Sequence, residues 1–160
     1  MRAVIFLFAA ILMQNPQAST PQQGVVERGD HVMGFSHEKT AHHFLLYANG
    51  GEINVSANEA SDKGSIDQIR MHLGHIARMF AAGNFNAPML IHDTNPPGVP
   101  AMTRLKEAIK YEYYETDRGA RIRLVTENSQ AIDAIHAFLL FQIIDHHTVD
   151  RPSITSEPGK

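Results

Sequence analysis

The sequence repeats one pattern, in which two strand-like segments joined by a short turn are followed by an amphipathic helix. The residues IDQI at 66–69 match IDAI at 132–135, and Leu73 matches Leu139 at the same offset. The chain therefore reads as ββα, a Pro-rich connection with a short helix, and ββα again. We expect an α+β fold: a tandem ββα–ββα pseudo-repeat that forms a four-stranded antiparallel sheet with its two main helices on one face.

The first hairpin is predicted from HHFLLYA and GEINVSA, which flank Asn49-Gly50. Asn-Gly supplies both positive-φ positions of a type I′ turn, and this places His42 on the core face and His43 on the opposite face. The predicted register pairs Ala48 with Gly51, Leu46 with Ile53, Phe44 with Val55 and His42 with Ala57. The second hairpin joins KYEYYET to ARIRLVT, with Gly119 in the left-handed position of a three-residue turn.

The first main helix is predicted over Ile66–Phe80, with N-cap candidates near Asp62 and an end near Gly83. Its core stripe is Ile66, Ile69, Leu73, Ile76 and Phe80. A short helix over Thr103–Ile109 is predicted after the Pro-rich stretch. The last helix, capped by Ser129, is apolar almost all round, so either it is covered on two sides or it forms a subunit interface, as in a homodimer.

The predicted domain boundaries are 1–20 for a secretory signal peptide, 21–36 for a polar linker or mature N-terminus, 37–148 for a single α+β domain and 149–160 for a disordered tail. Ala3–Met13 is an apolar run that follows Arg2 and is too short for a comfortable membrane span. The alternative is an uncleaved anchor or a buried strand. We expect an exported protein, periplasmic or extracellular, with no stable membrane span in the mature chain.

Composition excludes several functions. The formal net charge of −3 gives no basic excess, which argues against a nucleic-acid partner. The absence of cysteine excludes disulfides, thiolate zinc sites, iron–sulfur clusters and thiol catalysis. No HExxH motif, nucleophile elbow or glycine-rich phosphate loop is present.

The ten histidines suggest a transition-metal site. His72, His75 and Met79 lie at i, i+3 and i+7 beside the core stripe of the first helix, His42 lies on the core face of the first hairpin, and His92 lies in the Pro-rich stretch. Imidazoles with a thioether favour copper, and imidazoles alone also suit zinc. The predicted function is therefore copper or zinc binding through His42, His72, His75, Met79 and His92. The alternative for His72 and His75 is an ordinary place at a partly exposed helix edge.

Two other functions remain open at this stage. In both, the protein is an exported homodimeric module without a metal that uses the Pro-rich loop and the apolar last helix. It binds either a small ligand or another protein. In the ligand-binding version, a small molecule lies in a pocket lined by His92, Asp93 and the tyrosines Tyr111, Tyr113 and Tyr114. Whether the protein is an enzyme is undetermined. His146 and His147 are expected to favour the negative end of the last helix as imidazolium ions.

Overall fold

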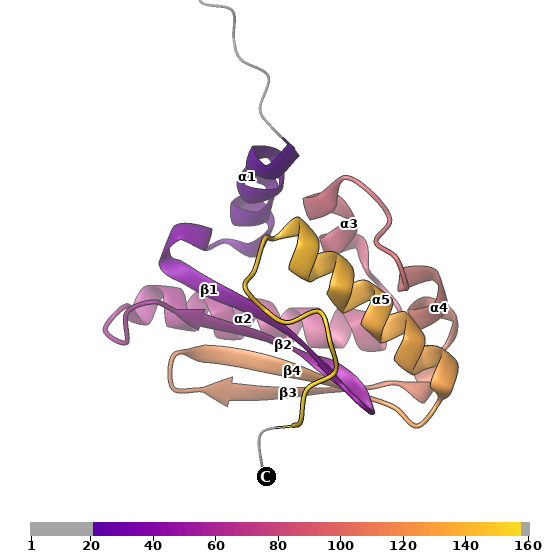
Figure 1. Cartoon of the computed structure of the whole chain (residues 1–160). Helices are drawn as coiled ribbons and strands as arrows, with labels where there is room; N and C mark the ends of the chain where they lie inside the picture. The colour runs from indigo at the N-terminus through magenta and orange to yellow at the C-terminus, as the bar shows by residue number, and fades with distance from the viewer. Residues whose placement is uncertain (1–20, 158–160) are drawn as a thin grey trace, which may run out of the picture.

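The computed structural model describes residues 21–157 (Figure 1), so the predicted signal peptide lies outside the described residues. The longer helices are α1 (Pro21–Met33), α2 (Lys63–Ala81) and α5 (Ser129–Asp145). The strands are β1 (Thr40–Tyr47), β2 (Gly50–Ala57), β3 (Lys110–Thr116) and β4 (Gly119–Val125). The short helices are α3 (Asn86–His92), α4 (Val99–Arg104) and the 3₁₀ turns η1 (His37–Lys39) and η2 (Lys106–Ala108).

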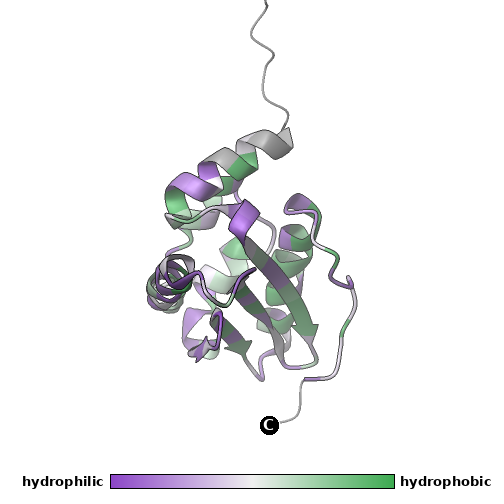
Figure 2. Ribbon diagram, turned by 90° about the vertical axis from the view of Figure 1, so that its left-hand side faces the viewer, coloured by the Kyte–Doolittle hydropathy of each residue, from purple (hydrophilic) through white to green (hydrophobic). Residues whose placement is uncertain are grey.

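The structure confirms the predicted α+β fold with its ββα-like repeat. The four strands form one antiparallel sheet in the order β1-β2-β4-β3. The second strands of the two hairpins are therefore the central pair, and Ile53 of β2 lies opposite Ile122 of β4. In the side view of Figure 2, hydrophobic residues are concentrated along the strands.

Both main helices pack on the same face of the sheet. On α5, Leu139 lies so close to Gly51 of β2 that a Cβ atom there would come within 2.2 Å of it. On α2, the backbone oxygen of Arg70 accepts a hydrogen bond of 3.2 Å from the Tyr113 hydroxyl of β3. The five residues of the predicted core stripe of α2 are all buried. The helices thus divide the sheet between them, α5 over β1 and β2, and α2 mainly over β3 and β4.

The predicted helix caps are confirmed for α2 and shifted for α5. The Asp62 side chain accepts a hydrogen bond from the Ser65 amide, and Gly83 follows the helix end with a φ of 77°. The cap of α5 is Asn128, one residue before the predicted Ser129. Its C-terminal turn uses His147 in the left-handed conformation, with a φ of 51°.

The predicted register of the first hairpin is wrong by two residues, whereas the predicted faces are right. Leu46 pairs with Gly51 instead of Ile53, and the turn consists of Ala48 and Asn49. Gly50 belongs to β2, where a Cβ atom would lie 1.9 Å from the Leu124 oxygen of β4. The close approach of a neighbouring strand therefore fixes this glycine in the sheet. A shift of two preserves the alternation of side chains, so His42 stays on the core face.

The second hairpin also has a two-residue turn instead of the predicted three. Thr116 pairs with Gly119, which opens β4 and is not left-handed. A Cβ atom at Gly119 would lie 2.2 Å from the Val55 oxygen of β2. This glycine therefore serves the contact between the two hairpins and not the turn.

The Pro-rich connection contains more helix than predicted. Pro88 lies in the first turn of α3, where a proline removes no helical hydrogen bond. Pro100 lies in the first turn of α4, so the helix begins at Val99 and not at the predicted Thr103. Gly98 precedes it with a φ of 84°, against the backbone oxygen of Ala134 in α5.

The segments predicted as a polar linker and a disordered tail make contacts with the domain where the structure describes them. Residues 21–33 of the expected linker form α1, which packs against α3, and Arg28 Nε donates to the Ile91 oxygen at 2.8 Å. The tail runs beside β1, where Asp150 accepts from the Phe44 amide at 3.0 Å and Leu46 accepts from the Thr155 amide at 2.9 Å. Both segments lack a hydrophobic repeat and are held by contacts with distant parts of the chain.

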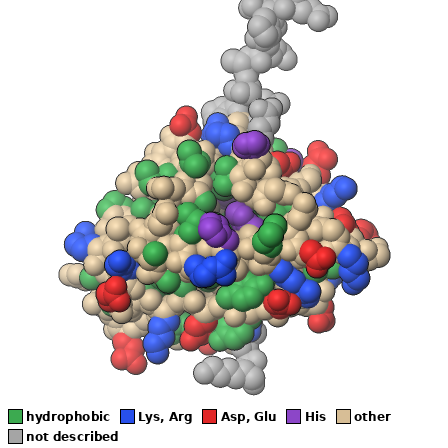
Figure 3. Space-filling model, turned by 180° about the vertical axis from the view of Figure 1, so that it is seen from behind, with side chains coloured by type: hydrophobic (Ala, Val, Ile, Leu, Met, Phe, Trp, Pro, Cys, Tyr) green, Lys and Arg blue, Asp and Glu red, His purple; other side chains and the backbone are tan. Residues whose placement is uncertain are grey.

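Charged side chains of both signs are interspersed over the face shown in Figure 3, and histidine side chains gather near its middle. None of the helices between residues 21 and 157 combines the length and hydrophobicity that a membrane crossing needs.

Candidate functional site

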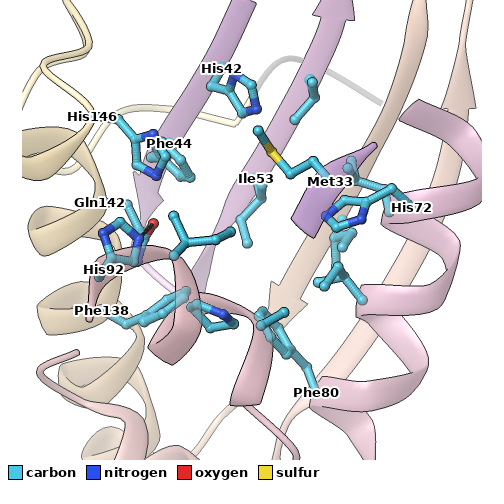
Figure 4. A pocket seen from close by; sticks show the side chains of 17 residues that line it. Met33, His42, Phe44, Ile53, His72, Phe80, His92, Phe138, Gln142 and His146 are labelled. Carbon is cyan, nitrogen blue, oxygen red and sulfur yellow. Dashed lines mark hydrogen bonds between the residues drawn. The ribbon is translucent and has the colours of Figure 1, made fainter. Parts of the chain in front are cut away.

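A cavity lies between the sheet, the two main helices, α3 and the end of α1 (Figure 4). The space in it that the centre of a water molecule can reach is ≈ 70 Å³, within a total empty volume of ≈ 560 Å³ that includes open solvent. Its lining side chains are Met33, His42, Phe44, Ile53, Val55, His72, Leu73, Ile76, Phe80, Ala87, Pro88, Ile91, His92, Ile122, Phe138, Gln142 and His146. The lining is therefore mostly apolar, with imidazoles and one amide as its polar groups. We call this space the inner cavity.

The inner cavity lies where the two repeats meet. Three helix positions contribute a lining residue from both α2 and α5, namely 72 and 138, 76 and 142, and 80 and 146. The pairs are His and Phe, Ile and Gln, and Phe and His. In every pair one residue is polar and its counterpart in the other repeat is apolar, so the two repeats contribute different chemistry to the same cavity.

The imidazole rings form a continuous row with Phe35. His72 packs edge-on to Phe35 at 5.7 Å between ring centroids, and Phe35 stacks on His42 at 6.1 Å. His42 stacks on His146 at 5.8 Å and an interplanar angle of 13°, and His146 meets His92 edge-on at 5.0 Å. We call these five residues the imidazole row.

Three imidazoles of the row are held neutral at pH 7. Burial lowers the pKa of His42 to about 4, with a further decrease from neighbouring His72. Burial and the nearby His75 lower the pKa of His72 to about 4, and burial with His42 lowers the pKa of His146 to about 3. Desolvation disfavours the charged form of each ring, so each keeps one nitrogen with a free lone pair. The lowered pKa of the partly buried His146 ring disagrees with the prediction of an imidazolium ion at the end of the last helix.

His92 differs from the others because it has a carboxylate partner. Its side chain is 1% exposed, and Nδ1 lies 2.5 Å from Asp145 Oδ2 at the end of α5. Its Nε2 lies 2.9 Å from Gln142 Oε1. This contact engages one end of the Gln142 amide, whichever way the amide is turned, and leaves the other end, assigned as Nε2, without a partner. Asp93, by contrast, is the left-handed C-cap of α3, is exposed and lines a different hollow.

Two polar atoms of the cavity lining lack a partner. Within the described residues, His42 Nε2 and Gln142 Nε2 are buried and make no hydrogen bond. A buried polar group without a partner costs ~1–3 kcal/mol. A bound molecule or ion that engages these atoms recovers that cost, and unpaired polar groups in an apolar cavity are a common feature of ligand sites.

Three of the five predicted metal ligands line the same cavity, but they do not form a cluster. His42, His72 and His92 all line the inner cavity, whereas His75 is exposed and Met79 is not part of the lining. Across residues 21–157, no three His, Asp or Glu side chains are arranged to hold a metal ion. The predicted copper or zinc site with His75 and Met79 among its ligands therefore remains a prediction. Of its five ligands, the cavity contains the imidazoles of His42, His72 and His92, which are spread along its lining.

The predicted tyrosine pocket around His92 does not form. Tyr111 and Tyr113 line a separate groove beside α2, with Arg70 and Gly74. Tyr114 points to the opposite side of the sheet, where the Arg121 guanidinium lies 5.1 Å from its ring centroid. The tyrosines are on the far hairpin, β3–β4, whereas His92 packs against α5.

Sequence reasoning missed Met33, Gln142, His146 and the carboxylate of Asp145. The sequence did contain an indication for Gln142. This polar residue is equivalent to Ile76 of the core stripe, in a helix that is apolar almost all round. His146 could have been found by the repeat, because it is equivalent to the core residue Phe80. Met33 carried no such signal, since the segment around it has no apolar period.

Comparison of the chain with protein-family models, curated proteins and solved structures found no match.

Proposed function

We propose that this protein binds a small, uncharged organic molecule in the inner cavity, about the size of one aromatic ring and with one hydrogen-bonding group. The observation that carries this proposal is the pair of buried, unpartnered atoms, His42 Nε2 and Gln142 Nε2, in an otherwise apolar lining. The apolar walls supply affinity through burial of the ring, and the two nitrogens supply orientation.

The charge of the ligand follows from the lining. Among the described residues that line the cavity, none is Asp, Glu, Lys or Arg. The imidazoles of His42, His72 and His146 are neutral at pH 7 because burial lowers their pKa values. A charged ligand would lose its hydration without gaining an opposite charge, at a large cost. A neutral alcohol, phenol or amide loses far less.

A series of matched probes tests this proposal on metal-free protein. Toluene, benzyl alcohol, benzoate and benzylamine have the same ring and differ in the group that it carries. We expect benzyl alcohol to raise the thermal unfolding midpoint most, toluene less, and the two ions least. Saturating a site at about 100 times the Kd stabilises a protein by ~2.7 kcal/mol, which calorimetry resolves readily.

Two variants and one control locate the binding site. Val55→Phe places a ring in the cavity and should abolish the response to every probe. Gln142→Leu removes the amide whose Nε2 has no partner and should reduce the advantage of benzyl alcohol over toluene. Met71→Phe adds a ring at a side chain that is 72% exposed and outside the cavity, and should respond like the wild type. Equal responses in Val55→Phe and wild type would refute binding in this cavity.

A further inference from the structure

The two edges of the sheet are covered differently. The tail lies along β1, where Leu46 and Ile154 form a parallel bridge. β3 is the opposite edge strand, at the bottom of the sheet in Figure 1, and within residues 21–157 it pairs with β4 alone. Its seven residues, Lys110–Thr116, pair with β4 without a bulge and include no proline. Bulges and prolines protect many exposed edges from pairing with other chains, so β3 is open to an added strand.

The alternation of hydrogen bonds across the sheet identifies the residues of β3 that point their backbone groups outward. The Ala57 amide donates to the Arg118 oxygen at 2.8 Å, so the even-numbered residues of β4 bond to β2. The odd-numbered residues of β4 therefore bond to β3, where their partners are the even-numbered residues. Tyr111, Tyr113 and Glu115 thus direct their N–H and C=O groups to the free edge.

The groove beside α2 follows this edge, and the helix and the strand run in opposite directions. Arg70 Nε lies 3.3 Å from Glu115 Oε2. Four residues later, Gly74 lies beside the central tyrosine of β3, whose ring a Cβ atom would meet at 3.8 Å. Arg78, one further turn along, lines the groove together with Tyr111. The Arg78 side chain is therefore level with Tyr111, at the other end of β3 from Glu115.

We infer that β3 pairs with β3 of a second copy of this chain, antiparallel and about a twofold axis at Tyr113. This register uses the outward backbone groups of both strands, because Tyr111 lies opposite Glu115 of the second copy. It gives each of the seven residues a partner and places no two like charges opposite each other. The opposed pairs are Lys110 and Thr116, Tyr111 and Glu115, Glu112 and Tyr114, and Tyr113 with itself. The two sheets then form one continuous sheet.

Charge complementarity makes a second copy the fitting partner. Residues that exchange hydrogen bonds across an antiparallel pair have Cα atoms about 5.5 Å apart, so Glu115 of the second copy lies beside Tyr111 and level with Arg78. Arg78 is exposed and takes part in none of the ion pairs of the described residues. The Glu115 side chain is 59% exposed. The chain thus supplies an exposed guanidinium and an exposed carboxylate at matching positions, and the twofold axis forms their contact twice.

This interface differs from the one considered for the last helix. α5 packs on the sheet with one side and on α4 with another, whereas the outer edge of β3 is uncovered in the described part of the chain. The β3 interface also lies outside the inner cavity, so it does not depend on the proposed organic ligand.

Analytical ultracentrifugation of the full chain tests this inference. We expect the wild type to sediment at micromolar concentration as a dimer of 17.8 kDa chains. Arg78→Glu and Glu115→Arg each place like charges together at both contacts and should weaken dimerisation by about tenfold or more. An equimolar mixture of the two variants should dimerise like the wild type, because each contact between unlike chains then joins one Glu to one Arg.

Two further variants complete the test. Tyr113→Pro removes an N–H group that points to the free edge, leaves the hydrogen bonds to β4 in place and should be monomeric. Arg104→Glu makes the same charge change at an exposed residue of α4 and should dimerise like the wild type. Circular dichroism and the thermal midpoint establish that each variant is folded, and the mixing experiment does not depend on the proline variant.

A monomeric wild type, a mixture that stays monomeric, a dimer that persists in folded Tyr113→Pro, or an equal loss in Arg104→Glu would each overturn the β3 interface. The aromatic probes report on the inner cavity of monomer and dimer alike. Failure of either proposal is therefore seen without the other.

Discussion

The partly buried imidazoles of His42, His72 and His146 should make the stability of the metal-free protein dependent on pH. Their pKa values are lowered in the folded state to about 4, about 4 and about 3, against an ordinary value of 6.5. The unfolded chain therefore binds more protons below pH 6.5, and stability rises with pH. The stabilising contribution is complete above pH 6.5 and is lost as the pH falls toward 4. At pH 4.5 each of these three residues should lower the free energy of unfolding by on the order of 1–3 kcal/mol relative to its value above pH 6.5.

Urea unfolding between pH 7.5 and 4.5 measures this loss through the midpoint concentration. His146→Phe installs the residue that the other repeat has at the equivalent position, Phe80, and should reduce the slope of stability against pH. His75→Ala removes an exposed imidazole and should leave most of the slope in place. A midpoint that stays constant over this range in the wild type would contradict the neutral, buried state of these rings.

At the scale of single elements, two glycines have opposite requirements. Gly74 lies in the middle of α2, where a Cβ atom would meet Tyr113 and Arg78 at an ordinary 3.8 Å. Alanine is the better helix former, so Gly74→Ala should stabilise the protein by ~0.5–1 kcal/mol. Gly51 of β2 has no room, because its Cβ atom would lie 2.2 Å from Leu139 and 2.6 Å from the Leu45 oxygen.

Gly51→Ala should therefore push α5 away from β2 and destabilise the protein by ~1–3 kcal/mol, the usual cost of overpacking. Chemical denaturation of the two variants side by side tests both effects. If both alanines shifted the free energy of unfolding in the same direction, the close approach of α5 to the central strands would be in doubt.

These elements also show where sequence reasoning succeeds. The hairpins, the two main helices and the face that each strand buries were predictable, because they follow from apolar periods of 2 and 3.6 within each segment. The register of the first hairpin was not, since the space around Gly50 and Gly51 depends on β4 and α5. The candidate site was predictable only in part: His42, His72 and His92 have positions that local pattern defines. Met33 and the Asp145 partner of His92 depend on contacts between segments more than 50 residues apart in the chain.

At the scale of the whole molecule, the tail protects an edge of the sheet. β1 is an edge strand, and the tail pairs with it through a parallel bridge between Leu46 and Ile154. Asp150 adds hydrogen bonds to the His43 ring and the Phe44 amide, and Glu157 pairs with Arg123. Unpaired edges invite pairing with other chains. These contacts predict that the tail contributes to the stability of the domain.

Truncation after Val149 should lower the free energy of unfolding by ~1–3 kcal/mol, because it removes hydrogen bonds to partly buried groups. It should also promote self-association through β1, which light scattering detects. Truncation after Glu157 keeps these contacts and serves as the control. A shortened chain that is as stable and as monodisperse as this control would show that the tail contributes nothing to the domain.

The meeting of two ββα units at one cavity has a consequence for how a ligand can lie in it. If the units were identical chains in a symmetric dimer, every residue around the cavity would occur twice, and a molecule with two unlike ends would fit equally well in either direction. In a single chain a substitution in one unit is not copied into the other, so Gln142 can stand where its counterpart is Ile76. Duplication within one chain thus permits a site that distinguishes the head of its ligand from its tail.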